Sequence, residues 1–371
     1  MLQTISFLLA GLLLFAYTGA ASLQERQLSI SGQDVRIDAL LSGWKGYPSV
    51  SGLANGGFVI CYQLDDDAYA QVFDFQGLMA GAPIKISEYD NGGIKPVVAG
   101  LSDGGYIVAW QTLNKIFNMK LVNLNGSTTS FSRINLDTEI GPNYPRVSRL
   151  STGTYAIVWE GSRPQNSEMD IYGTFYVNGT PAGEEVTVNT NQANDQLNPS
   201  ISYLTNGNYV VSWSSFEQDY GYWVVMATII YPNGLKVTPD FVVGPEASGP
   251  QENPSVAGLA NGGFVIAWQS LDDDGSSWNV YARIFDSNGN PQGLDLLINR
   301  ETAEAQGVPS VAGLNDGGIV ITWQSYAQDG DGWGIFAQIH EANGDIRVSE
   351  FLVNSYTTGD QITPQVSNLG D

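Results

Sequence analysis

One segment, PSVAGLANGGFVIAWQS from Pro254 to Ser270, recurs with variation along most of the chain. In each of the six full copies a leucine lies five residues after the repeat proline, a glycine eight after it, and a tryptophan or tyrosine fourteen after it. Successive copies are 48 to 55 residues apart. A fixed period of this length indicates one supersecondary unit used many times. The copies begin at Pro48, Pro96, Pro145, Pro199, Pro254 and Pro309, with a short seventh start at Pro364.

The repeat reads as four short β-strands. PSVAGL and GFVIAWQ are rich in β-branched and aromatic residues, and an Asn-Gly or Asp-Gly pair separates them in most copies. We expect a type I′ hairpin at this pair, because that turn requires positive φ at both central residues. NVYARIF at 279–285 is a typical third strand, and DLLINR at 295–300 a typical fourth. Each unit is therefore a four-stranded antiparallel meander.

Such a unit cannot bury both of its faces alone, so neighbouring units must stack. Four strands per period of about 50 residues predict an all-β β-propeller of four-stranded antiparallel blades. We favour six blades, with seven blades, one of them incomplete, as the alternative. In that alternative the leading segment QDVRIDAL, residues 33–40, is the outer strand of the seventh blade. A β-helix has shorter coils, and separate sandwiches would need larger cores than each unit can supply.

The apolar run from Phe7 to Tyr17, followed by small residues, is typical of a secretory signal peptide, and it is too short to span a membrane. We expect a signal peptide at 1–21, a single propeller domain at 22–371, a secreted, extracellular protein, and no stable membrane insertion after signal removal. The net charge of −23 disfavours nucleic acid and anionic lipid as partners and favours cations. Cys61, the one cysteine, is expected to be a small buried hydrophobe.

Alternating strand directions place the loops between second and third strands on the same rim as the linkers between repeats. These loops vary in length and are acidic, and variable loops on a rigid scaffold commonly carry binding. Carboxylates separated by glycine supply the hard oxygen ligands that Ca²⁺ prefers. Calcium is therefore the one cofactor that we expect, with Asp272, Asp274, Asp329 and Asp331 as candidate ligands.

Tryptophan beside polar groups on the same rim predicts ligand contact, since an indole face stacks on a sugar ring while amides bind its hydroxyls. Packing between strands is the competing interpretation. Catalysis is less favoured than binding, because one histidine cannot build a zinc site or a Ser-His-Asp triad, and no carboxylate pair is distinguished from the rest. The candidate ligand-binding residues are Trp223, Trp278, Trp333, Gln251 and Gln306.

The repeat, read as PSVAGLANGGFVIAWQS, VYARIFDSNGNPQG, LLIN and a Gln-x-x-Pro link, resembles those of large secreted bacterial proteins that are adhesin-like and associated with calcium-binding repeats. The resemblance covers about residues 48–369 and implies a propeller fold. We expect a secreted binding or adhesion module that presents an acidic, aromatic-containing loop face to an extracellular glycan or protein. The alternatives are a secreted glycan-active hydrolase on the same scaffold and a structural component of an extracellular matrix.

Overall fold

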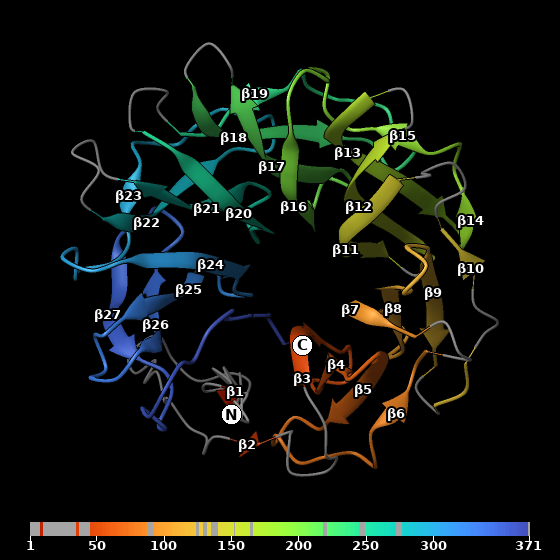
Figure 1. The fold of residues 1–371 in the computed structure, drawn as a ribbon, viewed down its shortest axis with the longest axis horizontal. Helices are drawn as coiled ribbons and strands as arrows, with labels where there is room; N and C mark the ends of the chain where they lie inside the picture. Colours follow the sequence, from red (N-terminus) through yellow and green to blue (C-terminus); the bar gives the residue numbers. More distant parts are fainter. Residues whose placement is uncertain are drawn as a thin grey trace.

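Six antiparallel sheets stand around a common axis, one sheet from each repeat, and form a six-bladed β-propeller (Figure 1). The computed structural model describes residues 8–9, 35–36, 45–87, 92–123, 126–128, 132–134, 140–151, 153–163, 166–217, 221–244, 249–271 and 277–369. The predicted fold class and blade number are confirmed. The predicted signal peptide lies outside the described residues, except for the two-residue strand β1 (Leu8–Leu9), which pairs with β2 (Val35–Arg36).

Each blade runs outward from the axis in sequence order. The six inner strands are β3 (Lys45–Gly52), β7 (Ile94–Gly100), β11 (Ile140–Ser151), β16 (Gln196–Tyr203), β20 (Gln251–Gly258) and β24 (Gln306–Gly313). The second strands are β4 (Phe58–Leu64), β8 (Tyr106–Gln111), β12 (Thr154–Arg163), β17 (Tyr209–Glu217), β21 (Phe264–Leu271) and β25 (Ile319–Tyr326).

The third strands are β5 (Asp67–Phe73), β9 (Phe117–Val122), β13 (Asn166–Val177), β18 (Tyr222–Ile230), β22 (Trp278–Phe285) and β26 (Trp333–His340). Most of the outer strands are only two residues long. They are β6 (Ile84–Lys85), β10 (Ser132–Arg133), β14 (Thr180–Pro181) with β15 (Val186–Thr187), β19 (Phe241–Val242), β23 (Leu296–Leu297) and β27 (Ile346–Leu352).

The turn between the first and second strands differs from the predicted type I′ hairpin. Within this turn of the first blade, between Leu53 and Gly57, only Gly56 has positive φ, at 81°, and its N–H donates to Leu53 O. Asn55 instead accepts the Gly57 N–H through its side-chain oxygen at 3.0 Å. The Asn or Asp before the shared glycine is therefore used for this local hydrogen bond, as is usual for short polar side chains in turns.

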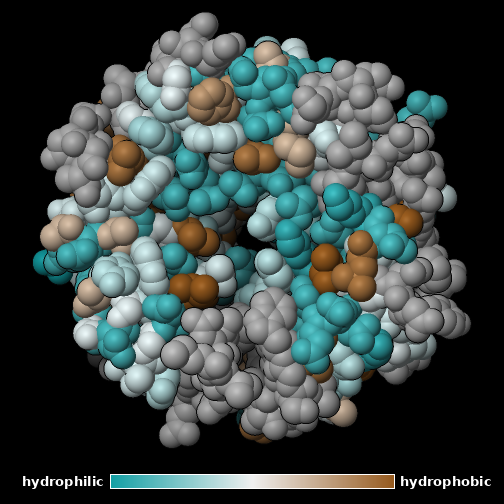
Figure 2. Space-filling model, in the orientation of Figure 1, coloured by the Kyte–Doolittle hydropathy of each residue, from teal (hydrophilic) through white to brown (hydrophobic). Residues whose placement is uncertain are grey.

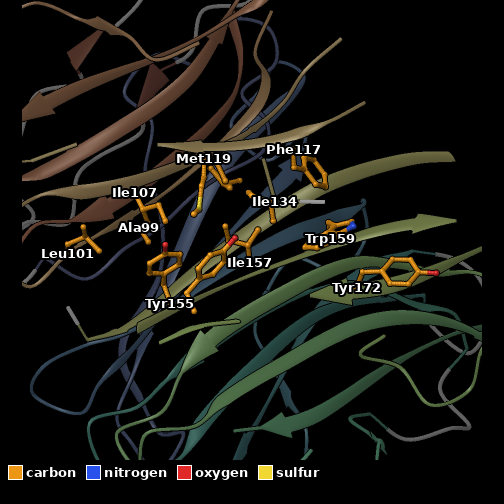
Figure 3. Close-up of a cluster of buried hydrophobic side chains, with 13 residues drawn as sticks. Ala99, Leu101, Ile107, Phe117, Met119, Ile134, Tyr155, Ile157, Trp159 and Tyr172 are labelled. Carbon is orange, nitrogen blue, oxygen red and sulfur yellow. The ribbon is translucent and has the colours of Figure 1, made fainter. Parts of the chain in front are cut away.

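The core lies between blades rather than within them. The side chains of one sheet pack on those of the next, and the Trp or Tyr of every second strand is at most 4% exposed. Figure 3 shows one such cluster, in which Met119 and Phe117 of the second blade meet Trp159 and Ile157 of the third. Burying these rings against a neighbour is the main reason that the blades close on one another.

Adjacent inner strands also approach very closely. A Cβ built on Gly258 would lie 2.2 Å from Tyr203 O, and one on Gly313 would lie 2.3 Å from Gly258 O. Serine hydroxyls join the same strands. Ser202 accepts the Gly258 N–H at 2.9 Å, and Ser255 accepts the Val311 N–H at 3.1 Å. These contacts fix the spacing of the inner strands around the axis.

The seventh repeat start continues this pattern beyond the sixth blade. Ser310 of β24 accepts the Val366 N–H at 3.1 Å, and Ser367 accepts the Gly52 N–H of β3 at 3.1 Å. Val366 packs on the core of the sixth blade and Leu369 on that of the first. Residues 361–369 thus lie as an additional inner segment between the last blade and the first, and Ser367 of this segment contacts β3 (Figure 1).

The described residues form six blades, five of four strands and one of five, and the C-terminal segment is not part of a further blade among those residues. Apart from β2, the leading segment that the seven-blade alternative assigned to an outer strand lies outside the described residues. The part of the chain that the structure describes contains no helix of the length and apolarity needed to cross a membrane.

Candidate functional site

Every inner strand has a β-bulge at the same place, at the residue just before its proline. That residue has a left-handed φ of 45° to 55° in all seven repeat starts. Such angles are uncommon outside glycine, and backbone strain of this kind gathers at functional sites. We name these residues the bulge ring: Tyr47, Lys95, Tyr144, Asn198, Asn253, Val308 and Thr363.

At five of the seven bulge residues, a side chain of the preceding blade holds the backbone. In four cases a Gln or Glu one residue after the buried aromatic accepts the N–H of the bulge residue, and in one case a serine does so. The bonds run from Lys95 to Gln63, from Asn198 to Glu160, from Asn253 to Ser214, from Val308 to Gln269 and from Thr363 to Gln324, at 2.7 to 3.2 Å. The strained backbone is thus fixed, while the side chain at the bulge is left to vary.

The bulge residues of three consecutive blades meet at Lys95. Its ammonium lies 3.8 Å from the ring centroid of Tyr144 and 5.6 Å from that of Tyr47, and it also donates to the side-chain oxygen of Asn143. These residues belong to blades whose inner strands converge only near the axis. The space-filling view is hollowed near the centre of the ring, where hydrophilic residues and several hydrophobic ones surround the opening (Figure 2).

Two further charges adjoin Lys95. Glu160 is 3% exposed, and its carboxylate accepts the Asn198 N–H at 2.7 Å and the Asn143 side-chain N–H at 3.3 Å. Arg146 is half-buried, donates to Pro145 O at 3.0 Å, and interacts electrostatically with Lys95 and Glu160. We name Lys95, Asn143, Tyr144, Arg146 and Glu160 the axial cluster.

Burial dominates the electrostatics of the axial cluster. It raises the pKa of Glu160, against the opposing effects of hydrogen bonds from Asn198 and Asn143 and of the charges on Arg146 and Lys95. It lowers the pKa of Lys95, where the favourable field of Glu160 is opposed by Arg146. It also lowers the pKa of Arg146. The cluster therefore holds two cations and one anion in partly buried surroundings that disfavour the charged forms. Buried charges with shifted pKa values of this kind are more typical of functional sites than of surface ion pairs.

Sequence reasoning did not find the axial cluster, although the repeat itself carried a signal for it. Lys95 stands where two other copies have Asn, Arg146 where four copies have Ser, and Glu160 where four copies have Gln. The substituted positions are far apart along the repeat, and only the fold brings them together at one place on the axis.

The loops between second and third strands do share a rim with the linkers between blades, as predicted. In the sixth blade the Trp333 N–H donates to Asp360 at 3.1 Å, and the Gly359 N–H donates to Asp331 at 3.1 Å. In the third blade the Met169 N–H donates to Asp195 at 2.9 Å. Since the bulges lie at the start of the inner strands, directly after the linkers, they open onto this same rim.

The three predicted tryptophans lie at the start of third strands, away from the axis. Each is partly buried. Trp223 packs edge-on against Phe216, with ring centroids 5.4 Å apart, and Trp333 packs in the same way against Tyr326 at 5.3 Å. Trp278 pairs with Leu271 across the hairpin. They contact their own blades rather than the axial cluster, and their role in ligand binding stays a prediction.

The two predicted glutamines are almost completely buried. Gln251 and Gln306 are each 1% exposed, and the amide of Gln306 donates to Glu304 O at 2.9 Å within the linker. At the equivalent position Gln196 accepts the indole N–H of Trp213 at 2.9 Å. These contacts tie the linkers to the blades, and a contact of Gln251 or Gln306 with a ligand stays untested.

The predicted calcium ligands divide into two groups. Asp272 and Asp274 lie outside the described residues. Asp329 accepts a hydrogen bond from the Asn354 side chain at 3.2 Å, and Asp331 accepts one from Gly359. No group of three or more metal-binding side chains occurs among the described residues. Calcium binding stays a prediction, and melting curves with calcium and with a chelator would test it.

Comparison with known proteins shows the fold and no family. No family model matches the chain, and no curated protein matches it. A Dyadobacter fermentans protein of unknown function is similar in structure, with a TM-score of 0.57 and 13% identity over 82% of this chain and 95% of that chain. An α-L-arabinanase of Penicillium chrysogenum complexed with arabinobiose has a TM-score of 0.52 and 13% identity, over 84% and 94% of the two chains. An α-L-arabinofuranosidase of Fusarium graminearum in complex with an iminosugar inhibitor has a TM-score of 0.50 and 10% identity, over 80% and 92%. This chain therefore shares the propeller fold with glycoside hydrolases.

Proposed function

We propose that this protein binds a carbohydrate at the axial hollow, where the bulge ring supplies both the aromatic and the polar contacts. The observation that carries the proposal is the group formed by Lys95, Tyr47 and Tyr144 from three consecutive blades. Tyr47 is 43% exposed, which leaves part of its ring open to a sugar. Asn198 and Asn253 offer amides to hydroxyl groups on the same ring of residues.

The structural neighbours support this choice of ligand class. The Penicillium arabinanase binds arabinobiose, and the Fusarium arabinofuranosidase binds an iminosugar. Both share the fold with this chain at low sequence identity, so they suggest the class of ligand. The residues that would bind it are identified from this chain alone. We propose, with the signal peptide at residues 1–21, that binding takes place outside the cell, as part of an adhesion or matrix function.

A matched pair of tyrosine variants tests the binding site. Tyr47 and Tyr231 are 43% and 46% exposed, but Tyr231 lies at a turn between third and outer strands, on the opposite rim. Calorimetric titration with arabinobiose and a panel of neutral and acidic oligosaccharides should show binding by the native protein. Tyr47→Ala should weaken that binding roughly threefold to tenfold, the range expected for one ring contact, and Tyr231→Ala should leave it unchanged. Equal affinities for the two variants would exclude the axial hollow as the site.

Hydrolysis of the bound glycan is the second candidate function. Glycosidases use two carboxyl groups, one of which must hold a proton. Burial raises the pKa of Glu160, and it raises the pKa of Glu252, which lies beside the bulge of the fifth blade. Release of reducing sugar from arabinan, lost in Glu160→Gln or Glu252→Gln, would support hydrolysis. Binding without any release of sugar would leave the protein a binding module.

A further inference from the structure

The axial cluster carries an excess of positive charge inside a strongly acidic protein. The chain has 15 Lys and Arg against 38 Asp and Glu, so carboxylates are abundant partners for any cation. Four other cations among the described residues form ion pairs with carboxylates, whereas the buried Lys120 donates to the backbone oxygen of Ile86. Lys85 pairs with Asp67, Lys236 with Asp240, Arg283 with Asp295, and Arg347 with both Asp316 and Glu341.

Lys95 and Arg146 differ from these four cations. Within the described part of the chain, neither has a carboxylate oxygen within 4.0 Å. Lys95 rests on two tyrosine rings and one amide, and the only hydrogen bond of Arg146 among those residues goes to Pro145 O. A guanidinium has five N–H donors, so most of those of Arg146 remain available.

Glu160 does not neutralise these two charges. Its two carboxylate oxygens accept hydrogen bonds from Asn198 and Asn143. The bond from the Asn198 N–H is the same backbone contact that Gln63, Gln269 and Gln324 accept in other blades. The cluster keeps a net positive charge of one when all three groups are ionised. The lowered pKa of Lys95 has burial as its main cause, which means that the surroundings compensate its charge incompletely.

We propose that Lys95 and Arg146 together bind an anionic group of the carbohydrate, and that the ligand is therefore an acidic glycan with a uronic acid at the axial hollow. The proposal rests on the proposed carbohydrate binding and specifies its ligand class. A planar carboxylate fits the fork of the Arg146 guanidinium, and the adjacent exposed ring of Tyr47 can take the face of the sugar that carries it. A sulfate ester offers the same negative charge on a different group.

The repeat supplies substitutions that preserve the fold. Lys95→Asn places at the second bulge the residue that Asn198 and Asn253 occupy, and Arg146→Ser places in β11 the residue found at Ser49, Ser200, Ser255 and Ser310. Lys236→Gln is the matched control, since it removes one positive charge from an ion pair outside the axial cluster. Melting curves of all three variants would verify that they are folded.

Titration calorimetry with four sugars then separates the outcomes. The probes are trigalacturonate, its neutral methyl ester, a sulfated galactose oligosaccharide, and arabinobiose. We expect trigalacturonate to bind at least about tenfold more tightly than its ester, and Lys95→Asn and Arg146→Ser each to abolish most of this preference, as charge-assisted hydrogen bonds require. Lys236→Gln should behave like the native protein, and added salt should weaken the binding of the acid alone.

Each alternative result has a distinct meaning. Preference for the sulfated sugar that depends on Lys95 and Arg146 would support an anion site and replace uronate by sulfate. Equal binding of trigalacturonate and its ester, or variants without effect, would overturn this inference while leaving carbohydrate binding intact. Failure of every sugar to bind would overturn both proposals.

Discussion

The hydroxyl of Ser310 accepts the backbone N–H of Val366 at 3.1 Å, just as Ser255 accepts that of Val311 one repeat earlier. Residues 361–369 therefore occupy the position of an inner strand after the sixth blade. Ser367 completes the ring by accepting the N–H of Gly52, 315 residues away in sequence. The contact between the last blade and the first depends on this segment.

The apolar anchors of the C-terminal segment should matter more than its exposed residues. We expect Val366→Ala combined with Leu369→Ala to lower the free energy of unfolding by about 2 kcal/mol, because both side chains pack on blade cores. Ile362→Ala, in the same segment but 41% exposed, should change it by less than about 0.5 kcal/mol. Urea titration measures both, and a double variant as stable as the native protein would show that the segment does not close the ring.

The close approach of inner strands predicts a steric effect at Gly258. Its replacement by alanine puts a methyl group 2.2 Å from Tyr203 O, so the two strands must separate. We expect Gly258→Ala to cost roughly 2–4 kcal/mol of stability. Gly183→Ala is the control, since a Cβ there meets no atom within 4 Å. Similar melting temperatures for the two variants would contradict the spacing described for the inner strands.

Glu160→Gln should stabilise the protein at neutral pH, by about 1 kcal/mol, because the amide keeps the hydrogen bond to Asn198 without a buried charge. The pKa of Glu160 is raised in the folded state, so the folded state binds more protons just above the ordinary pKa of 4.5. The native protein therefore loses stability as pH rises through that window, and the variant does not. Denaturation at pH 4 and pH 7 would measure the difference, which should be larger at pH 7.

His340 gives a pH dependence of the opposite sign. It is 3% exposed, its Nδ1 bonds Gly344 O at 2.9 Å, and its Nε2 has no partner among the described residues. Burial lowers its pKa below the ordinary 6.5, so the unfolded chain binds more protons between the two values. Stability conferred by the neutral ring is thus lost as pH falls below about 6.5.

Other blades have phenylalanine at the position of His340, for example Phe73 and Phe285. We expect His340→Phe to raise the free energy of unfolding by about 1–2 kcal/mol at pH 7, by removing an unsatisfied buried nitrogen. The gain should grow at pH 5. Chemical denaturation at both pH values checks this, and a gain that shrinks at low pH would contradict a neutral buried histidine.

The fold could be predicted from the sequence because its signal is repeated. Pro254, Leu259, Gly262 and Trp268 recur in register, and each recurrence has one structural reason, such as the buried indole of the second strand. The turn type was wrong because Asn261 contributes its side chain rather than its backbone angle, as its hydrogen bond to the Gly263 N–H shows. Dipeptide identity alone does not separate these two uses of asparagine.

The axial cluster could not be predicted in the same way. Glu160 lies 14 residues after Arg146 and 65 after Lys95, and nothing in their spacing indicates contact. The acidic loops have an unusual composition that indicates a binding site. The cluster instead consists of single residues that differ from those at the same position in other copies of the repeat. The left-handed bulge that aligns it involves residues as different as Tyr47, Lys95 and Val308, so it has no signature in residue type.

At the bulge before each proline, the contacts that hold the backbone are independent of the side chain of the bulge residue. At five of the seven bulges the backbone is held by a side chain from the neighbouring blade, and none of the seven bulge side chains belongs to a buried blade core. Seven positions around the opening can therefore change in charge, size or aromatic character without disturbing the cores that hold the blades together. A scaffold with this arrangement can be retargeted to a different sugar by exchanging a handful of residues, and the bulge ring is the place to introduce such specificity by design.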